Sequence, residues 1–152
     1  MKNRRKVAAI SLSAAALVSI ALFEGYRDKA YTPLPGDVPT IGFGTTKGVK
    51  LGDQTNPTNA LKRKLRDLTE FEGAIQRCVH VPLHQHEYDA YISLAYNIGE
   101  AAFCRSTLVR KLNAGDYAGA CAEILRWDKF RGRTIRGLTK RREAEYEICL
   151  GR

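Results

Sequence analysis

The chain has 152 residues and a net charge of +9, with 25 Lys and Arg residues against 16 Asp and Glu residues. This length suits one domain, and a composition that is 44% hydrophobic and 27% charged is that of a globular protein rather than a disordered one. The interior contains no apolar run of about 20 residues, which excludes a polytopic membrane protein. The excess charge is concentrated in two clusters: residues 1–6 carry +4, residues 126–142 carry +7, and the remainder sums to −2.

The first basic cluster precedes a weakly hydrophobic segment. Residues 7–23 carry no charge, and nine of these 17 positions are Ala or Ser. As a helix the segment would be about 25 Å long, slightly shorter than a hydrocarbon core of ~30 Å. A basic flank before an apolar segment favours export, with the flank left in the cytoplasm. Three interpretations are open: an uncleaved weak anchor, which we favour, a signal peptide cleaved after Ala21, and a first buried helix in a protein that is not exported.

The four cysteines agree with export. They are even in number and widely spaced, and they form no CxxC pair of the kind that indicates zinc or a redox motif. In an oxidising compartment such as a bacterial periplasm we expect two disulfides. Of the three possible connectivities we favour Cys121–Cys149, which would join two C-terminal helices, with Cys78–Cys104 as the second bridge. Four free thiols in a cytosolic protein are the alternative.

The region after the apolar segment is predicted to contain a small β structure followed by a helix. Turn-forming residues are dense between Pro33 and Pro39, and residues 40–46 then alternate large and small side chains, which predicts a short strand or hairpin. From Asn56 onward the pattern becomes helical, with Asn56 as the cap and Pro57 at the first helical position. The apolar face of this helix is predicted to consist of Leu61, Leu65, Leu68 and Ile75, with Lys62, Arg63, Lys64 and Arg66 largely on the other face.

The C-terminal half is predicted to be a helical bundle. Residues 87–98 are apolar nearly all round, which is typical of a helix buried at the centre of a bundle. Residues 106–113 form a short helix, Asp116 is expected to cap the next one, and Thr139 is expected to cap the last. The predicted fold class is therefore α+β and mostly helical, with a small N-terminal β-hairpin region and a C-terminal helical bundle in one domain.

Three polar residues in the first third of the chain could carry chemistry. Glu24 directly follows the apolar segment, where desolvation would favour the protonated carboxyl that a general acid requires. Asp37 and Thr40 lie across the Pro- and Gly-rich loop and could hold a water molecule between them. An acid on one side and a carboxylate-held water on the other is the inverting route to glycosidic bond hydrolysis. The alternative is a helix-end carboxyl and a turn aspartate without a catalytic role.

The residues around these positions resemble the phage-type lysozymes, glycoside hydrolase family 24. The resemblance begins with FEGYR at residues 23–27 and PTIGFGTT at residues 39–46. It continues with AYNIG at residues 95–99, STLVRKLN at residues 106–113 and GLTKRRE at residues 137–143. It therefore extends over almost the whole chain from Phe23 onward.

This resemblance implies a lysozyme-like fold and a muramidase that hydrolyses the β-1,4 bond between N-acetylmuramic acid and N-acetylglucosamine in peptidoglycan, for host cell lysis. Glu24 matches the catalytic glutamate of the family, and Thr40 matches its active-site threonine. The family's aspartate usually lies two residues after the tyrosine that corresponds to Tyr31, and Pro33 occupies that position here. Asp37 is the nearest candidate to replace this aspartate and to position water.

Further site residues follow from the same resemblance. Substrate contacts are expected from Tyr31, Gly44 and Thr45, and Thr45 stands where many relatives have a histidine, so that imidazole is absent here. No cofactor and no metal are expected. His84 and His86 are two candidate metal ligands without a third, which is more typical of a solvated loop.

The N-terminus resembles that of signal-anchor-release endolysins, lysozymes held in the inner membrane by a weak segment that later leaves the bilayer. We therefore assign residues 1–23 to a signal-anchor segment and residues 24–152 to a lysozyme catalytic domain. We expect the anchored enzyme, with its catalytic domain in the periplasm, to be inactive, and release to let residues 7–23 join the fold. The expected partners are peptidoglycan and, through residues 7–23, the host inner membrane; the released protein is expected to be a periplasmic monomer.

The second basic cluster, residues 126–142, could bind nucleic acid, but an exported protein rarely meets any, and no nucleic acid partner is expected. Peptidoglycan stem peptides and anionic lipid head groups are the available anions. A solvated face with one or two structural arginines is the alternative. A second class of function, a membrane-anchored binding module without catalysis, would not clear cell walls.

Overall fold

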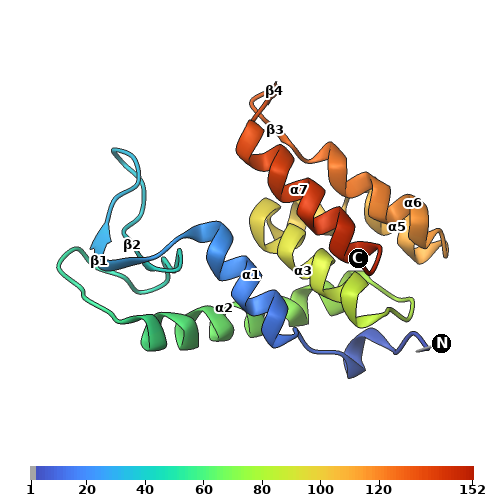
Figure 1. The fold of residues 1–152 in the computed structure, drawn as a ribbon, viewed down its shortest axis with the longest axis horizontal. Helices are drawn as coiled ribbons and strands as arrows, with labels where there is room; N and C mark the ends of the chain where they lie inside the picture. The colour runs from blue at the N-terminus through green and yellow to red at the C-terminus, as the bar shows by residue number, and fades with distance from the viewer. Residues whose placement is uncertain (1–2) are drawn as a thin grey trace. The chain divides into compact units, whose positions relative to one another are not determined.

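The computed structural model describes residues 3–152, so Lys2 of the first basic cluster lies outside the described residues. The chain divides into two compact units (Figure 1). Unit 1 consists of the residues up to Ser13 together with Glu70–Arg152, and unit 2 consists of Ala14–Thr69. The long helix α2, Pro57–Cys78, runs through the boundary between them.

Unit 2 contains the predicted β structure. Helix α1, Ala14–Glu24, is followed by the antiparallel strands β1, Arg27–Tyr31, and β2, Thr40–Gly42. Beyond β2 the chain turns back on itself, because Ile41 and Thr45 exchange backbone hydrogen bonds of 3.0 and 3.1 Å. This tight turn agrees with the hairpin expected over residues 40–46, whereas β1 has no alternating pattern and was not predicted.

Helix α1 occupies only the second part of the apolar segment. Residues Val7–Ala9 form a single 3-10 turn, and the α-helix begins at Ala14. One side of α1 is buried, whereas Val18, Leu22 and Phe23 are 49%, 74% and 39% exposed. Within residues 3–152, no helix combines the length and the apolar character needed to span a bilayer.

The start of α2 is as predicted, whereas its buried face is predicted only in part: Leu68 and Ile75 are buried, but Leu65 is not. The Asn56 side chain accepts a hydrogen bond of 2.9 Å from the Asn59 N–H, as an N-cap does, and Pro57 is the first helical residue. Leu65 is 46% exposed, whereas Lys64 is fully buried. The buried stripe follows a spacing of about four residues, and it consists of Ala60, Lys64, Leu68, Glu72 and Ile75. Two charged residues therefore lie on the face that hydrophobicity alone would reserve for leucine.

Unit 1 is a helical bundle around α3, Gln85–Ile98. Helix α3 is buried along most of its length, as expected, and contacts the last helix, α7, Arg136–Cys149. The shorter helices are α4, Glu100–Cys104, α5, Thr107–Asn113, and α6, Tyr117–Glu123, followed by a 3-10 turn over Ile124–Arg126. Asp116 caps α6 as predicted, since its side chain accepts a hydrogen bond of 2.8 Å from the Gly119 N–H.

Both disulfides lie in unit 1. Cys121 at α6 bonds to Cys149 at the end of α7, and Cys78 at the end of α2 bonds to Cys104 at the end of α4. The expected connectivity is confirmed. The bonded cysteines are 28 residues apart in the Cys121–Cys149 bridge and 26 residues apart in the Cys78–Cys104 bridge, so each bridge joins two different helices.

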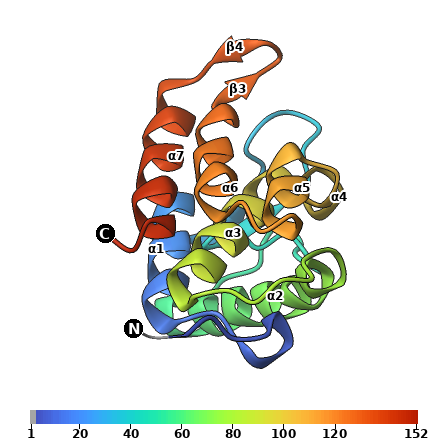
Figure 2. The ribbon, with the colours of Figure 1, turned by 90° about the vertical axis from the view of Figure 1, so that its right-hand side faces the viewer.

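A hairpin that the sequence did not predict joins α6 to α7. Strands β3, Lys129–Phe130, and β4, Arg133–Thr134, pair antiparallel and extend beyond the ends of the two helices (Figure 2). The Ile135 N–H donates to the Asp128 carbonyl, which closes the hairpin so that α7 begins at Arg136. The prediction that Thr139 caps α7 is therefore wrong: Thr139 lies inside the helix.

Candidate active site

Glu24 is the last residue of α1, and its carboxyl group lies against the loop that follows β2. Gly44 in this loop has a φ of +81°, and a Cβ atom added to it would lie 3.0 Å from Glu24 Oε2 and 3.3 Å from Glu24 Cβ. The chain can approach the glutamate this closely only without a side chain at position 44. Two segments that the sequence singled out, the end of the apolar segment and the TIGFG motif, therefore meet at the half-buried Glu24.

A second glycine holds the same loop against α2. Gly42 has a φ of +63°, and a Cβ atom added to it would lie 2.7 Å from the Cβ atom of Ala60. Such a distance is shorter than two carbon atoms tolerate, so the loop reaches its place beside α2 only with glycine at position 42. The alternation of small and large residues in TIGFG thus reflects two close approaches, one to α2 and one to Glu24.

Thr45 is buried within unit 2 and bonded to a residue that the sequence analysis missed. Its side chain is only 3% exposed, and its hydroxyl donates a hydrogen bond of 2.9 Å to Asp67 Oδ2 on α2. The bond ties the TIGFG loop to α2 a second time, beyond the contact at Gly42. Asp67 lies within a polar stretch of α2, and no spacing or motif distinguishes it from the charged residues around it.

Thr40 begins β2 and lies opposite Tyr31 at the end of β1. Thr40 is 7% exposed, and its hydroxyl donates a hydrogen bond of 3.2 Å to the Val38 carbonyl. The Tyr31 ring lies under the guanidinium group of Arg27, at 4.5 Å from the ring centroid. Both predicted residues therefore lie on the β structure itself, at the end where the connecting loop leaves and returns.

Asp37 lies in that connecting loop and is exposed. Its N–H donates a hydrogen bond of 3.0 Å to the Leu34 carbonyl, which closes a turn with Gly36 at a φ of +88°. Only two residues separate Asp37 from Thr40 at the start of β2. The exposed Asp37 therefore lies just after the turn, in the part of the loop that returns to β2.

His84 and His86, the two candidate metal ligands, lie at the start of α3 in unit 1. The rings of His84 and His86 stack with centroids 5.2 Å apart, and His86 Nδ1 lies 3.0 Å from the Cys149 carbonyl oxygen. In the part of the chain that the structure describes, no group of three or more His, Cys, Asp or Glu side chains is arranged to hold a metal.

The second basic cluster separates into buried and exposed residues. Arg142 is fully buried and bonds to Glu145, to Asn97 and to the Trp127 carbonyl, and Arg141 Nε bonds to Glu145 at 3.0 Å. Burial lowers the pKa of the Arg142 guanidinium, and the Glu145 carboxylate opposes this shift. These two arginines are structural. Most of the exposed cations of the cluster lie on or beside the β3–β4 hairpin, at Lys129, Arg131, Arg133 and Arg136, and Arg126 and Lys140 are exposed as well.

Comparison with known sequences places this arrangement in a family. The phage lysozyme family model matches residues 21–145. The chain is 41% identical over 138 residues to an endolysin of Acyrthosiphon pisum secondary endosymbiont phage 1, covering 88% of this chain and 94% of that protein. It is 35% identical over 141 residues to a SAR-endolysin of Pseudomonas phage phiKMV, covering 90% and 87% of the two chains.

Solved structures agree with the sequence comparisons. A variant of P22 lysozyme matches with a TM-score of 0.84 and 35% identity over 93% of this chain and 99% of that one. The muramidase domain of SpmX from Asticaccaulis excentricus matches with a TM-score of 0.86 and 31% identity over 93% and 98%. The chain belongs to the phage lysozyme family, and the predicted lysozyme-like α+β fold is confirmed. Its activity is that of an endolysin, a glycosidase that acts on peptidoglycan.

Proposed function

We propose that this endolysin is a muramidase that hydrolyses the β-1,4 bond between N-acetylmuramic acid and N-acetylglucosamine, with Glu24 as the general acid. The observation that carries the proposal is the position of the Glu24 carboxyl group against Gly44, at the end of a helix and beside the TIGFG loop. The similarity to a muramidase domain at 31% identity supports the choice of bond.

Asp37 and Thr40 are proposed to position the attacking water. Glu24 donates its proton to the glycosidic oxygen as the bond to the anomeric carbon breaks, and Asp37 takes a proton from the water that forms the new bond to this carbon. The exposure of Asp37 and its place shortly before Thr40 in the chain support this role. Tyr31 and Gly44 are proposed as the neighbouring contacts of the sugar chain, Gly44 through its backbone, whereas the buried Thr45 is proposed to support this loop through its bond to Asp67.

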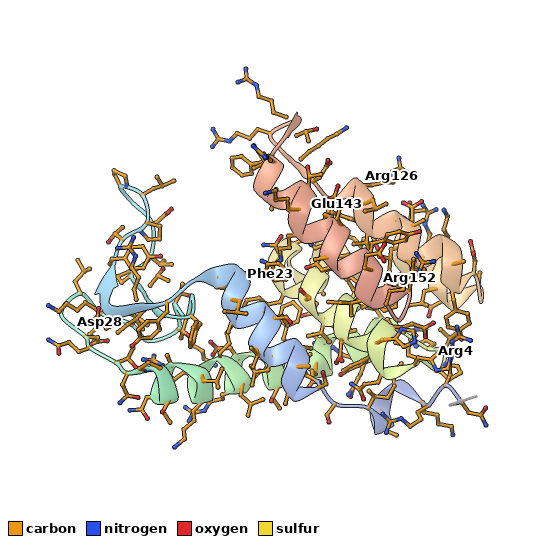
Figure 3. All side chains as sticks on the ribbon, in the orientation of Figure 1. Arg4, Phe23, Asp28, Arg126, Glu143 and Arg152 are labelled. Carbon is orange, nitrogen blue, oxygen red and sulfur yellow. A yellow bond between two sulfur atoms is a disulfide. The ribbon has the colours of Figure 1, made fainter. Side chains whose placement is uncertain are left out.

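Substitution of the two carboxylates tests this mechanism. Glu24→Gln keeps the size of the side chain but cannot donate a proton, so clearing of chloroform-treated Gram-negative cells should fall to background while the folded fraction stays unchanged. Asp37→Asn should reduce the rate about 10²–10⁴-fold, the usual contribution of a general base. Glu143→Gln serves as the control, because Glu143 is an exposed acid on α7 (Figure 3).

Each outcome assigns a role. Clearing retained by Glu24→Gln would refute Glu24 as the acid. A loss of less than about tenfold in Asp37→Asn would remove the base role from Asp37 and leave the water to Thr40. A binding module without catalysis would not clear the cells even as wild type.

The apolar segment is proposed to act as a membrane anchor before release. This divides the chain into a signal-anchor segment, residues 1–23, and a catalytic domain, residues 24–152. Relatives that are 33–35% identical are SAR-endolysins. The exposed Val18 and Leu22, one helical turn apart, together with Phe23 give α1 a neighbouring set of apolar side chains at its surface that would also suit lipid. The anchored catalytic domain would face the periplasm, and the released protein would be a periplasmic monomer.

The mass of the protein recovered from lysing cells tests the anchor. An anchor that is released intact leaves residues 1–152 in the soluble fraction, since nothing is cut. Cleavage of a signal peptide after Ala21 would instead remove the first 21 residues, and a mature chain of that mass would refute the anchor.

A further inference from the structure

The residues before α1 form an arm that is bound to the rest of unit 1. We define the arm as residues 3–13. Arg5 and Leu83 exchange two backbone hydrogen bonds of 2.8 Å each, so the arm pairs like a short strand with the segment before α3 (Figures 1 and 2). Val7 and Ile10 are 6% and 4% exposed. The arm is therefore fixed by both its backbone and its apolar side chains.

Arg4 makes the most specific contacts of the arm (labelled in Figure 3). Its guanidinium group donates two hydrogen bonds to the Glu87 carboxylate, of 2.7 and 3.1 Å, and lies 3.7 Å from the centroid of the Tyr117 ring. The Glu87 side chain is only 4% exposed and also accepts a bond of 2.8 Å from the His84 N–H. A bidentate ion pair with a buried carboxylate favours arginine over lysine at this position, and so does an aromatic ring stacked on the guanidinium group.

At its other end the arm is held by two further acids. The N–H groups of Leu12 and Ser13 donate to the carboxylates of Glu72 and Asp89, the second at 3.0 Å. Both acids are nearly buried, at 7% and 8% exposed. Both hydrogen bonds lie immediately before the first turn of α1, so the two acids fix the end of the arm.

Gln85 connects the two ends of the arm. Its amide nitrogen donates to the Ser11 carbonyl at 2.8 Å and to Asp89 at 3.0 Å, and its carbonyl oxygen accepts a bond of 2.8 Å from Arg5. Each of these three hydrogen bonds joins Gln85 either to the arm or to Asp89, which itself binds the arm. Unit 1 thus binds both ends of the arm through hydrogen bonds, and Val7 and Ile10 are buried between them.

We propose that Glu72, Gln85, Glu87, Asp89 and Tyr117 form a binding site for a basic, extended peptide, whose ligand is the chain's own arm, and that the Arg4–Glu87 pair latches the released enzyme. Without the arm, three nearly buried carboxylates would lose partners, and a buried charge without a partner is costly. The site therefore favours the docked arm over an exposed one.

The consequence for regulation rests on the proposed anchor. While residues 7–23 lie in the membrane, the basic flank stays on the cytoplasmic side and the site is on the periplasmic side, so Arg4 and Glu87 cannot meet. After release they pair, and return of the segment to the bilayer requires the pair to break. The latch thus makes release directional without any covalent change.

Two variants of equal charge test the latch. Arg4→Gln and Lys6→Gln each remove one cation from the basic flank, but Lys6 is exposed and makes none of the contacts described for Arg4. In the purified full-length protein, hydrogen exchange at the Arg5, Leu12 and Leu83 amides should become about tenfold faster or more in Arg4→Gln. In Lys6→Gln it should stay within about twofold of wild type.

A double variant separates the pair from an effect on α3. Glu87 also caps α3, so Glu87→Gln alone changes more than the latch. If the pair is the latch, adding Arg4→Gln to Glu87→Gln should cause little further acceleration of exchange. Equal exchange in Arg4→Gln and wild type, or equal acceleration by Arg4→Gln and Lys6→Gln, would overturn the proposal.

The same variants in lysing cells distinguish the latch from the anchor. With intact chains of residues 1–152 in both fractions, we expect Arg4→Gln to lower the soluble fraction several-fold compared with Lys6→Gln. Equal soluble fractions in these two variants would overturn the latch but leave the anchor and the muramidase activity standing. Mature chains that lack 21 residues would overturn the anchor and the latch together, and clearing by those chains would still support the muramidase.

Discussion

Gly44 lies directly against the Glu24 carboxyl group. Its missing Cβ atom leaves the space that Glu24 Oε2 approaches to 3.0 Å, and its φ of +81° is a conformation that other residues rarely adopt. A change at Gly44 therefore acts on the proposed general acid without altering any group that donates or accepts a proton.

Gly44→Ala should lower kcat much more than it lowers stability. The new methyl group would crowd Oε2 and Cβ of Glu24 and displace the proposed acid slightly, and since a misplacement of about 1 Å can cost about 10²-fold in rate, this smaller shift should cost roughly tenfold. Gly48→Ala is the matched control, because Gly48 also has a positive φ, +71°, but a Cβ atom there meets nothing within 4 Å. Both variants should lose about 1–2 kcal/mol of stability from backbone strain, measured by urea unfolding.

Equal loss of kcat in the Gly44 and Gly48 variants would show that backbone strain alone explains the effect. It would then follow that the contact between Gly44 and Glu24 does not position the acid. A loss confined to KM would instead assign Gly44 to sugar binding through its backbone.

At the level of elements, α5 and α6 are joined by an ion pair that responds to pH. Lys111 on α5 donates a hydrogen bond of 2.7 Å to Glu123 on α6, and Arg126 lies 3.4 Å from the same carboxylate. The hydrogen bond from Lys111 lowers the pKa of Glu123 below its ordinary value, against the opposing effect of burial. At pH values near the ordinary pKa of a glutamate, Glu123 therefore binds fewer protons in the folded state than in the unfolded state.

This pair should make the protein less stable in acid. The stabilisation is complete above the ordinary pKa of a glutamate and is lost as the pH falls through the lowered pKa of Glu123, from roughly pH 4 downward. In Glu123→Gln the free energy of unfolding should be lower at pH 6 and should depend less on pH between 6 and 3. Urea unfolding at several pH values measures both effects.

Glu147→Gln is the control for this measurement, because Glu147 pairs with Arg152 at 3.8 Å and both side chains are at least half exposed. An exposed pair of this kind contributes little to stability. If the Glu123 and Glu147 variants show the same dependence on pH as wild type, other carboxylates are responsible for the acid sensitivity.

Across the whole molecule, the sequence correctly predicted features that depend on a single residue type at a single position. The caps at Asn56 and Asp116 and the number of cysteines belong to this kind, and the motifs led to the close approach of Gly44 to Glu24. The hydrophobic pattern was less reliable. Lys64 is buried and Leu65 is exposed. Which residues of a helix are buried depends on their spacing along the chain, so a single position on the buried face can hold a charged residue.

Contacts between distant polar residues could not be predicted. Asp67 bonds to Thr45 across 22 residues, and Arg4 bonds to Glu87 across 83, with no motif to link either pair. Strands β3 and β4 are only two residues long, too short for an alternation of polar and apolar residues to be visible in the sequence. Helix α7 follows this hairpin and begins at Arg136, so Thr139 lies inside the helix. Motifs in the sequence led to the proposed site residues, whereas polar pairs between distant residues form only in the folded chain.

Helix α1 limits how this enzyme can be engineered. Apolar N-terminal segments are routinely deleted to obtain a protein that is easy to express and handle. Here such a deletion would remove the helix whose last residue is Glu24, together with the arm that precedes it in the chain and is bound to unit 1. A soluble variant would have to keep all eleven residues of α1 and change only its water-facing side chains, Val18 and Leu22 first, to polar ones.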